Sequence, residues 1–409
     1  MVLATGHLLR NCRQYIPNTL RIAAGLRIQF GSAGLSLPPR HWLELAPTRI
    51  ARDTMDIDRT GTYDPSLTGS ADDGIYGIPG TLDDASLVYI PVPWEVTTSY
   101  GKGTAMGPEA IRKASPQLDL YLRGLPNHFE KGFYLLPPEP EIVELNSLCG
   151  PLAAAIQNHL EQHGSLDGNA ELMQALEDVN RASKRVNELI YDRCRALDTD
   201  GKLLALIGGD HSSPLGQIHY LCDRYNGNLG LLHIDAHHDL RDRYQGFTGS
   251  HASIMRNVIA LNSAPSRLVQ VGIRDFSKEE CAYAEQHPAI DVFYDDDMKE
   301  RLYEGEPFAA IADSIIERLP EKVYISFDID GLKPDLCPHT GTPVSGGLEF
   351  EQARFLLKRL VQSGRRIVGF DLCEVAPNPH APEDEWDGNV GARLLFLLSS
   401  WMMESQPNA

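Results

Sequence analysis

The stretch LGLLHIDAHHD, residues 229–239, decides the fold class, because an apolar run ends directly in a group of Asp and His residues. Runs of the same kind occupy residues 203–209, 267–273, 323–330 and 366–375. They are continuous rather than alternating, as expected of strands buried on both faces of a parallel sheet. Segments with helical spacing separate them. The sequence therefore predicts a three-layer α/β/α sandwich with a mostly parallel sheet.

Acidic and imidazole side chains gather where four of these predicted strands end. They are Asp210, His211, Asp235, His237, Asp239, Asp328, Asp330 and Glu374. In an open α/β sheet the carboxyl ends of the strands face one crevice, so residues far apart in the sequence converge there. Carboxylates at this density repel one another unless a cation holds them together. A pair of divalent metal ions would do so.

The number and chemical type of these side chains favour two ions over one. The proposed ligands are His211, Asp235, His237, Asp239, Asp328 and Asp330. Asp235 and Asp328 could bridge the ions, which leaves one His and one Asp for each site. Mixed carboxylate and imidazole ligands suit Mn²⁺, and Ni²⁺, Co²⁺ and Fe²⁺ are also compatible. Two neighbouring ions would share and acidify one water, which predicts a hydrolytic centre.

Five motifs resemble the ureohydrolase family of arginase and agmatinase. They are SYGKGTAMGPEAIRKAS at 99–115, GGDHS at 208–212, DAHHD at 235–239, SFDIDGLKPDLCPHTGTPVSGGL at 326–348 and EVAP at 374–377. The resemblance runs from about residue 87 to residue 402 and implies an arginase-like fold, a dinuclear metal centre with the six ligands above, and a homotrimer or homohexamer. It also implies that Glu374 holds a substrate guanidinium. The hydrolysis of a guanidino compound to urea and an amine or ammonia is thus the expected reaction.

Two further residues would move protons in that reaction. Asp239 is expected to carry a proton to the departing amine, as a ligand that also contacts the nucleophile. His251 lies where many ureohydrolases carry a proton-shuttling His, although HA stands here where the family often has HG. A His that only hydrogen-bonds to a loop backbone is the alternative.

The substrate depends on the loops around the metal ligands. The segments 93–104, 244–255 and 385–395, with the long N-terminal extension, look most like guanidine hydrolase, a nickel-dependent branch of the family. Free guanidine is therefore the first expected substrate, and Ni²⁺ the expected metal in that case, with Mn²⁺ otherwise. The proposed wall of a small closed pocket consists of bulky side chains: Trp94, His238, Tyr244 and Trp386. Accessory proteins that load the metal would be partners.

Three other functions remain open. Agmatine or another 4-guanidino compound is the second substrate expectation, although Arg241 and Arg243 would oppose its ammonium if they faced the pocket. Surface ion pairing with Asp242 is the alternative for these arginines. The DLR motif at 239–241 also looks like formimidoylglutamase. A catalytically silent binding protein on the same scaffold is the candidate from another class, and the complete ligand set argues against it.

Composition excludes several partners. The chain has 409 residues with 37 Lys and Arg against 56 Asp and Glu, a formal net charge of −19, so it lacks the positive field that binds nucleic acid or an anionic membrane. The longest apolar stretch, near 394–403, is too short to cross a bilayer of about 30 Å. The seven cysteines are an odd number without a CxxC pair, which predicts free thiols in a reducing compartment such as the cytoplasm.

Three regions are predicted along the chain. Residues 1–50 form an N-terminal arm, which has no Asp or Glu before residue 44 and resembles either an organelle transit segment or a basic extension. Residues 51–86 form an irregular acidic segment. Residues 87–409 form the catalytic domain, with a helical insertion at about 150–200.

Overall fold

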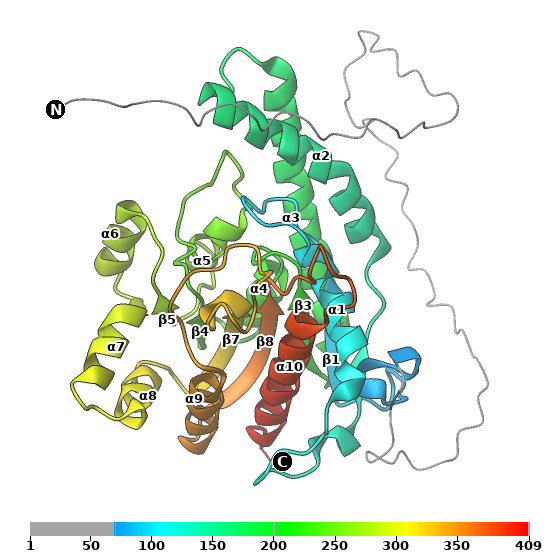
Figure 1. Cartoon of the computed structure of the whole chain (residues 1–409), viewed down its shortest axis with the longest axis vertical. Coiled ribbons are helices and arrows are strands. Elements are labelled where there is room, and N and C mark those ends of the chain that lie inside the picture. The colour runs from blue at the N-terminus through cyan, green and yellow to red at the C-terminus, as the bar shows by residue number, and fades with distance from the viewer. Residues whose placement is uncertain (1–68, 70, 199–200, 408–409) are drawn as a thin grey trace, which may run out of the picture. The chain divides into compact units, whose positions relative to one another are not determined.

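Eight parallel strands form one sheet in the computed structural model, which describes residues 69, 71–198 and 201–407 (Figure 1). The strands are β1 Leu87–Val92, β2 Phe133–Leu135, β3 Leu203–Gly208, β4 Gly230–Ile234, β5 Arg267–Ile273, β6 Ile290–Tyr294, β7 Lys322–Asp328 and β8 Arg366–Cys373. Their order is β2-β1-β3-β8-β7-β4-β5-β6, and every neighbouring pair is parallel. The predicted parallel sheet is confirmed. The predicted arm at 1–50 and the first part of the segment 51–86 lie outside the described residues.

Helices cover both faces of this sheet (Figure 1). They are α1 Gly107–Ala114, α2 Pro140–His163, α3 Ala170–Asp198, α4 Leu215–Arg224, α5 Ile254–Ile259, α6 Lys278–Gln286, α7 Asp295–Tyr303, α8 Phe308–Glu317, α9 Phe350–Gln362 and α10 Trp386–Glu404. In β3 the side chains of Ala205 and Ile207 pack with α1 and α7–α10, whereas Leu204 and Leu206 pack with α2–α6. Alternate strand residues point to opposite faces, so the two hydrophobic cores define three layers. None of the helices in the described ranges has the length and apolar content needed to cross a membrane.

The long helices α2 and α3 lie in the region predicted as a helical insertion. They pack against each other, and α3 also packs on α4. From this position they hold two loops that border the candidate site. Gln157 of α2 donates to the carbonyl of Thr98 at 3.0 Å, and Asn180 of α3 accepts from the amide of Thr248 at 2.9 Å.

The strand order explains how distant motifs meet. The four strands that end in the predicted Asp, His and Glu clusters, β3, β8, β7 and β4, are consecutive neighbours in the sheet. The carboxyl ends of these strands are in register across the sheet, with Ile207 opposite Leu372, Asp328 opposite Cys373 and Ile234 opposite Phe327. Because all four strands run in the same direction, their clusters project from one edge.

Candidate metal centre

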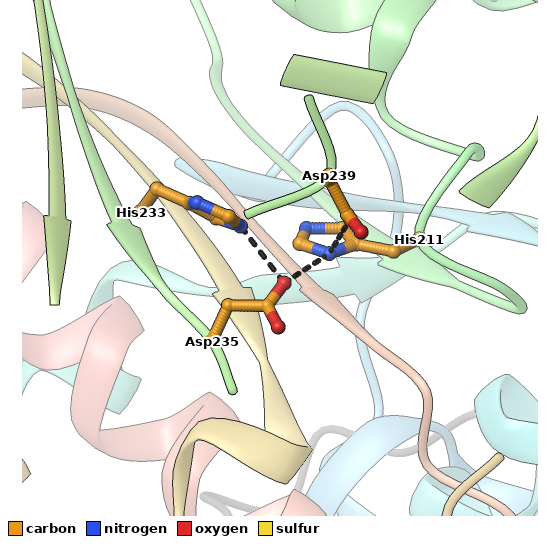
Figure 2. A group of neighbouring side chains, drawn as sticks. All are labelled: His211, His233, Asp235 and Asp239. Carbon is orange, nitrogen blue, oxygen red and sulfur yellow. Dashed lines mark hydrogen bonds and ion pairs between the residues drawn. The ribbon is translucent and has the colours of Figure 1, made fainter. Parts of the chain in front are cut away.

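Three carboxylates surround one imidazole nitrogen of His211 at this edge. The Nδ1 atom of His211 lies 2.9 Å from Asp235 Oδ2, 3.2 Å from Asp239 Oδ2 and 3.3 Å from Asp328 Oδ2. Figure 2 shows the first two of these carboxylates with His211 and a further histidine, His233. The four predicted ligands of the first ion are buried, and each of the three carboxylates has one oxygen within 3.3 Å of His211 Nδ1. They come from the ends of β3, β4 and β7.

The predicted ligands of the second ion form an adjoining group. His237 Nδ1 lies 3.1 Å from Asp330 Oδ2 and 3.4 Å from Asp235 Oδ1. Asp235 thus turns one oxygen toward His211 and the other toward His237, which is the arrangement of a carboxylate that bridges two cations. Asp328 places Oδ2 3.3 Å from His211 Nδ1, and its Oδ1 accepts from the amide of Asp330 at 2.8 Å, as Asp235 Oδ1 does from the amide of His237.

The electrostatics of this group favour a bound cation. Burial raises the pKa of Asp239 to about 7, and the charge of Asp235 adds to the effect. Burial also raises the pKa of Asp328, with further contributions from its carboxylate neighbours. Burial opposes the charged form of His211, but its hydrogen bonds to the three carboxylates prevail and raise its pKa. Without a metal, protons therefore offset the negative charge, and divalent cations would displace them.

Glu374 presents an unpaired carboxylate oxygen beside the cluster. Its Oε1 accepts from the amide of His211 at 2.9 Å, whereas the buried Oε2 has no hydrogen-bond partner among the described residues. Burial raises the pKa of Glu374, and the charge of Asp210 adds to this. A Cβ on Gly341 would lie 2.8 Å from Oε2, so the glycine keeps the space in front of this oxygen free. A planar cation with N–H donors, such as a guanidinium, would satisfy it.

The backbone holds Glu374 in a strained conformation. Its φ is 65°, in the left-handed region that costs a residue with a side chain about 1–2 kcal/mol. The amide of Glu374 donates to Gly209 O at 2.9 Å, and Thr340 Oγ1 donates to the carbonyl of Glu374 at 2.8 Å. These two bonds hold the backbone of Glu374 in the strained conformation from which its carboxylate projects. Strained backbone conformations of this kind cluster at functional sites.

His251 begins a short 3-10 helix, His251–Ser253, and the charges of His237, His211 and Asp235 act on its ring. Its Nε2 is 3.3 Å from Ser99 Oγ, and its amide donates to Thr97 Oγ1 at 3.1 Å. Burial lowers its pKa to about 3, and the neighbouring positive charges of His237 and His211 contribute. The ring is therefore neutral near pH 7, with one nitrogen that carries no proton.

Of the predicted pocket wall, Tyr244 has its ring 6.4 Å from that of His251, whereas the other three side chains lie in separate environments. Trp94 is 1% exposed and packs in the hydrophobic core on the α2–α6 side of the sheet. His238 is buried against the rings of Phe276 and Tyr294. Trp386 is 47% exposed at the start of α10, and its indole donates to the carbonyl of Asp335 at 2.9 Å. Each side chain satisfies its apolar or polar groups in a different environment.

The two arginines that follow the DAHHD motif are held by ion pairs. Arg241 contacts Glu280 at 3.3 Å and stacks over the ring of Tyr244. Arg243 contacts Asp242 at 3.0 Å. The expected surface ion pair with Asp242 thus forms for Arg243, whereas Arg241 pairs with the buried Glu280.

Several buried polar residues that support the cluster were missing from the sequence prediction. His233 lies 2.8 Å from Asp235 Oδ2, and Ser326 lies 2.9 Å from His211 Nε2 and donates to Asp371 at 3.2 Å. A usable signal was present, because Ser326 stands two positions before Asp328 in β7, and His233 stands two positions before Asp235, which directly follows β4. Residues two apart in a strand point to the same face.

Comparison with known proteins agrees with this geometry. Residues 85–397 match the model of the arginase family. An N(1)-aminopropylagmatine ureohydrolase of Synechocystis sp. is 30% identical over 327 residues, which cover 79% of this chain and 91% of the relative. Another of Thermus thermophilus is 32% identical over 300 residues, with coverage of 72% and 84%. The crystal structure of the agmatine ureohydrolase of Thermoplasma volcanium has a TM-score of 0.60 at 23% identity, with coverage of 83% and 95%.

The chain belongs to the arginase family. The predicted family and the arginase-like α/β fold are confirmed. The expected enzyme class, hydrolases that act on guanidino C–N bonds, is confirmed as well.

Proposed function

We propose that this protein hydrolyses a linear guanidino compound to urea and an amine, with two divalent metal ions bound by the predicted ligands. The observation that carries the proposal is the unpaired Oε2 of Glu374 next to a buried group of His and Asp side chains that could hold metal ions. A guanidinium bound to this oxygen would lie beside the carboxylates of the cluster. Both the charge and the hydrogen-bond donors of the substrate would then be matched.

The residues of the chain have distinct parts in this reaction. The two ions, when bound, would supply a water acidified to a nucleophile near neutral pH. Glu374 would fix the plane of the guanidinium and offset its charge. Asp239 would take up a proton and pass it to the departing nitrogen, and the neutral ring of His251 would exchange protons with solvent through Ser99.

The relatives favour a substrate that carries an amine chain beyond its guanidino group. Both relatives described above are named N(1)-aminopropylagmatine ureohydrolases, which supports the agmatinase-type alternative over free guanidine. Two structural observations agree with it. Arg241 and Arg243 are paired with carboxylates, and the predicted wall of Trp94 and His238 is directed elsewhere.

Free guanidine is the second candidate, and Lys102 favours it. The ammonium of Lys102 donates to the carbonyl of Thr98 at 2.8 Å in the loop that also holds Ser99. Burial lowers the pKa of Lys102, while the charges of Glu95, Asp210 and Glu374 oppose this shift. A fixed ammonium within the field of Glu374 would oppose the guanidinium charge of both substrates, but only agmatine carries a second cation that it would also repel. It would equally suit the carboxylates of a formimidoylglutamase substrate.

The metal and the assembly follow from the family resemblance. His and Asp ligands accept both Mn²⁺ and Ni²⁺, and we propose Ni²⁺ only if guanidine is the substrate. A homotrimer or homohexamer and metal-loading accessory proteins remain predictions.

A urea-release assay tests the proposal. The metal-free protein would be loaded with Mn²⁺ or Ni²⁺ and offered guanidine, methylguanidine, agmatine, arginine and guanidinobutyrate, with formamide release from formiminoglutamate measured separately. The proposal predicts urea from agmatine or a related linear compound at a higher kcat/KM than from guanidine. A preference for guanidine would select the second candidate, and no urea from any of these compounds would contradict the proposed function.

A further inference from the structure

His233 is a buried histidine in direct contact with the candidate metal centre. It precedes Asp235 by two positions at the end of β4, so both side chains point to the same face. Its Nε2 lies 2.8 Å from Asp235 Oδ2 (Figure 2). One ligand atom from each of His211, His233, Asp235 and Asp239 lies within 4.8 Å of the others. By position alone, His233 could therefore be either a metal ligand or a hydrogen-bond donor to Asp235.

Gln270 of β5 distinguishes these two roles. It pairs with His233 across the β4–β5 ladder, and its Nε2 lies 2.8 Å from the carbonyl oxygen of His238. A carbonyl oxygen only accepts hydrogen bonds, so this end of the Gln270 amide is the NH₂ group. His238 Nδ1 completes the assignment, since it lies 2.7 Å from Gln270 Oε1 and can donate to it.

The orientation of Gln270 determines the tautomer of His233. The same Nε2 of Gln270 lies 2.9 Å from His233 Nδ1 and donates its second hydrogen there. The Nδ1 atom must then accept, which leaves the proton of the neutral ring on Nε2. A protonated Nε2 has no lone pair for a metal, and it points at Asp235 Oδ2.

We infer that His233 is a positioning residue that donates a hydrogen bond to Asp235 and is not a metal ligand. The Nε2–H group of His233 holds Asp235 so that Oδ2 faces His211 and Oδ1 faces His237. Gln270 enforces this role, and through its two bonds with His238 it ties the DAHHD loop to β5. Through these bonds, His238 helps to hold Gln270 in the orientation that positions His233 and Asp235. This inference rests on the metal centre of the proposed function.

Two substitutions of His233 separate donation from ligation. Gln in its place puts an amide N–H near the former Nε2, whereas Leu fills the space without a donor. We expect H233Q to bind two ions per chain with affinities close to those of the wild type. H233L should bind them about 10- to 100-fold more weakly, the range for loss of a hydrogen-bond partner of a metal ligand. Equal losses in both variants, or no loss in H233L, would overturn the inference.

Gln270→Glu gives predictions of opposite sign for the two roles. A carboxylate can only accept, so the proton of His233 would move to Nδ1 and a lone pair on Nε2 would face Asp235. If His233 positions Asp235, metal affinity should fall by about 10- to 100-fold. If His233 were a ligand, the new carboxylate would make it a stronger one, and tighter binding would overturn the inference. Gln217→Glu is the matched control, because Gln217 is also buried but bonds to Leu204 O in another part of the sheet.

The measurement is a calorimetric titration of each metal-free protein with Mn²⁺, with thermal unfolding as the test of folding. It needs no substrate, so it separates this inference from the proposed reaction. If the wild type binds two ions and H233L binds them with the same affinities, the inference about His233 is refuted and the proposed function is not. Wild-type protein that binds no divalent ion would refute the proposed function and this inference together.

Discussion

Replacement of Glu374 by Gln tests the part of the site that recognises the substrate. Gln keeps the volume and can still accept from the His211 amide through its oxygen. Its NH₂ group would take the place of the unpaired Oε2, where it would meet the N–H donors of a guanidinium. The variant therefore loses the charge match and adds a repulsive contact between donors.

The expected loss follows from the burial of this carboxylate. Breaking a buried charged pair costs about 2–4 kcal/mol of transition-state binding, which is about 30- to 700-fold in kcat/KM. Metal content should stay at two ions per chain, because Glu374 is not among the proposed ligands. Burial raises the pKa of Glu374, so its charged form destabilises the metal-free fold, and E374Q should unfold at no lower a temperature than the wild type.

The assay measures urea release and metal content of E374Q, with Glu317→Gln as the control. Glu317 is exposed at the end of α8, before β7 begins, and thus at the opposite end of that strand from Asp328. This control should behave like the wild type. A kcat/KM for E374Q within about threefold of the wild type would refute the clamp, and loss of metal would mean that Glu374 supports the ligands instead.

Other residues give further expected outcomes. Asp235→Asn and Asp328→Asn should each lower metal content and abolish urea release, and full occupancy with normal turnover in either would refute the bridging assignment. Metal affinity in calorimetry should fall as the pH drops below about 7, because protons bound by Asp239 compete with the ions; a pH-independent affinity would contradict this. Lys102→Met should raise kcat/KM for agmatine relative to guanidine if the ammonium repels a distal cation, and an unchanged ratio would exclude that role. Trp94→Ala should destabilise the fold by about 3–5 kcal/mol in denaturant unfolding, and a loss below about 1 kcal/mol would contradict its place in the core.

The sequence was enough to predict that the Asp, His and Glu side chains meet at one edge of the sheet, because each buried apolar run ends directly in such residues. The run at 229–239 changes from buried apolar residues to Asp and His within one residue, and the runs at 203–209 and 323–330 do the same. Burial on both faces fixes such runs as central parallel strands. Short edge strands lack this signal. β2 has three residues, and β6 is mostly half-buried, so both were found only in the structure.

The direction of individual side chains near the site required the strand pairing. His237 and His238 are adjacent and chemically identical, yet only His237 faces the carboxylates. His238 turns to Gln270 of β5, and this contact depends on which strand lies beside β4. The burial of Trp94 likewise depends on which elements pack beside it, and the sequence alone does not show these elements. The sequence indicated a bulky residue near the site, and its burial depends on helices that follow it by dozens of residues.

The most direct test of the central claim measures bound metal and urea release in the same samples. Metal-free protein would receive increasing amounts of Mn²⁺ or Ni²⁺, and bound ions per chain would be compared with turnover of the best guanidino substrate. The account predicts no urea without metal and full turnover at two ions per chain. Urea release that persists in metal-free protein, or two bound ions with no turnover of any guanidino compound, would contradict it.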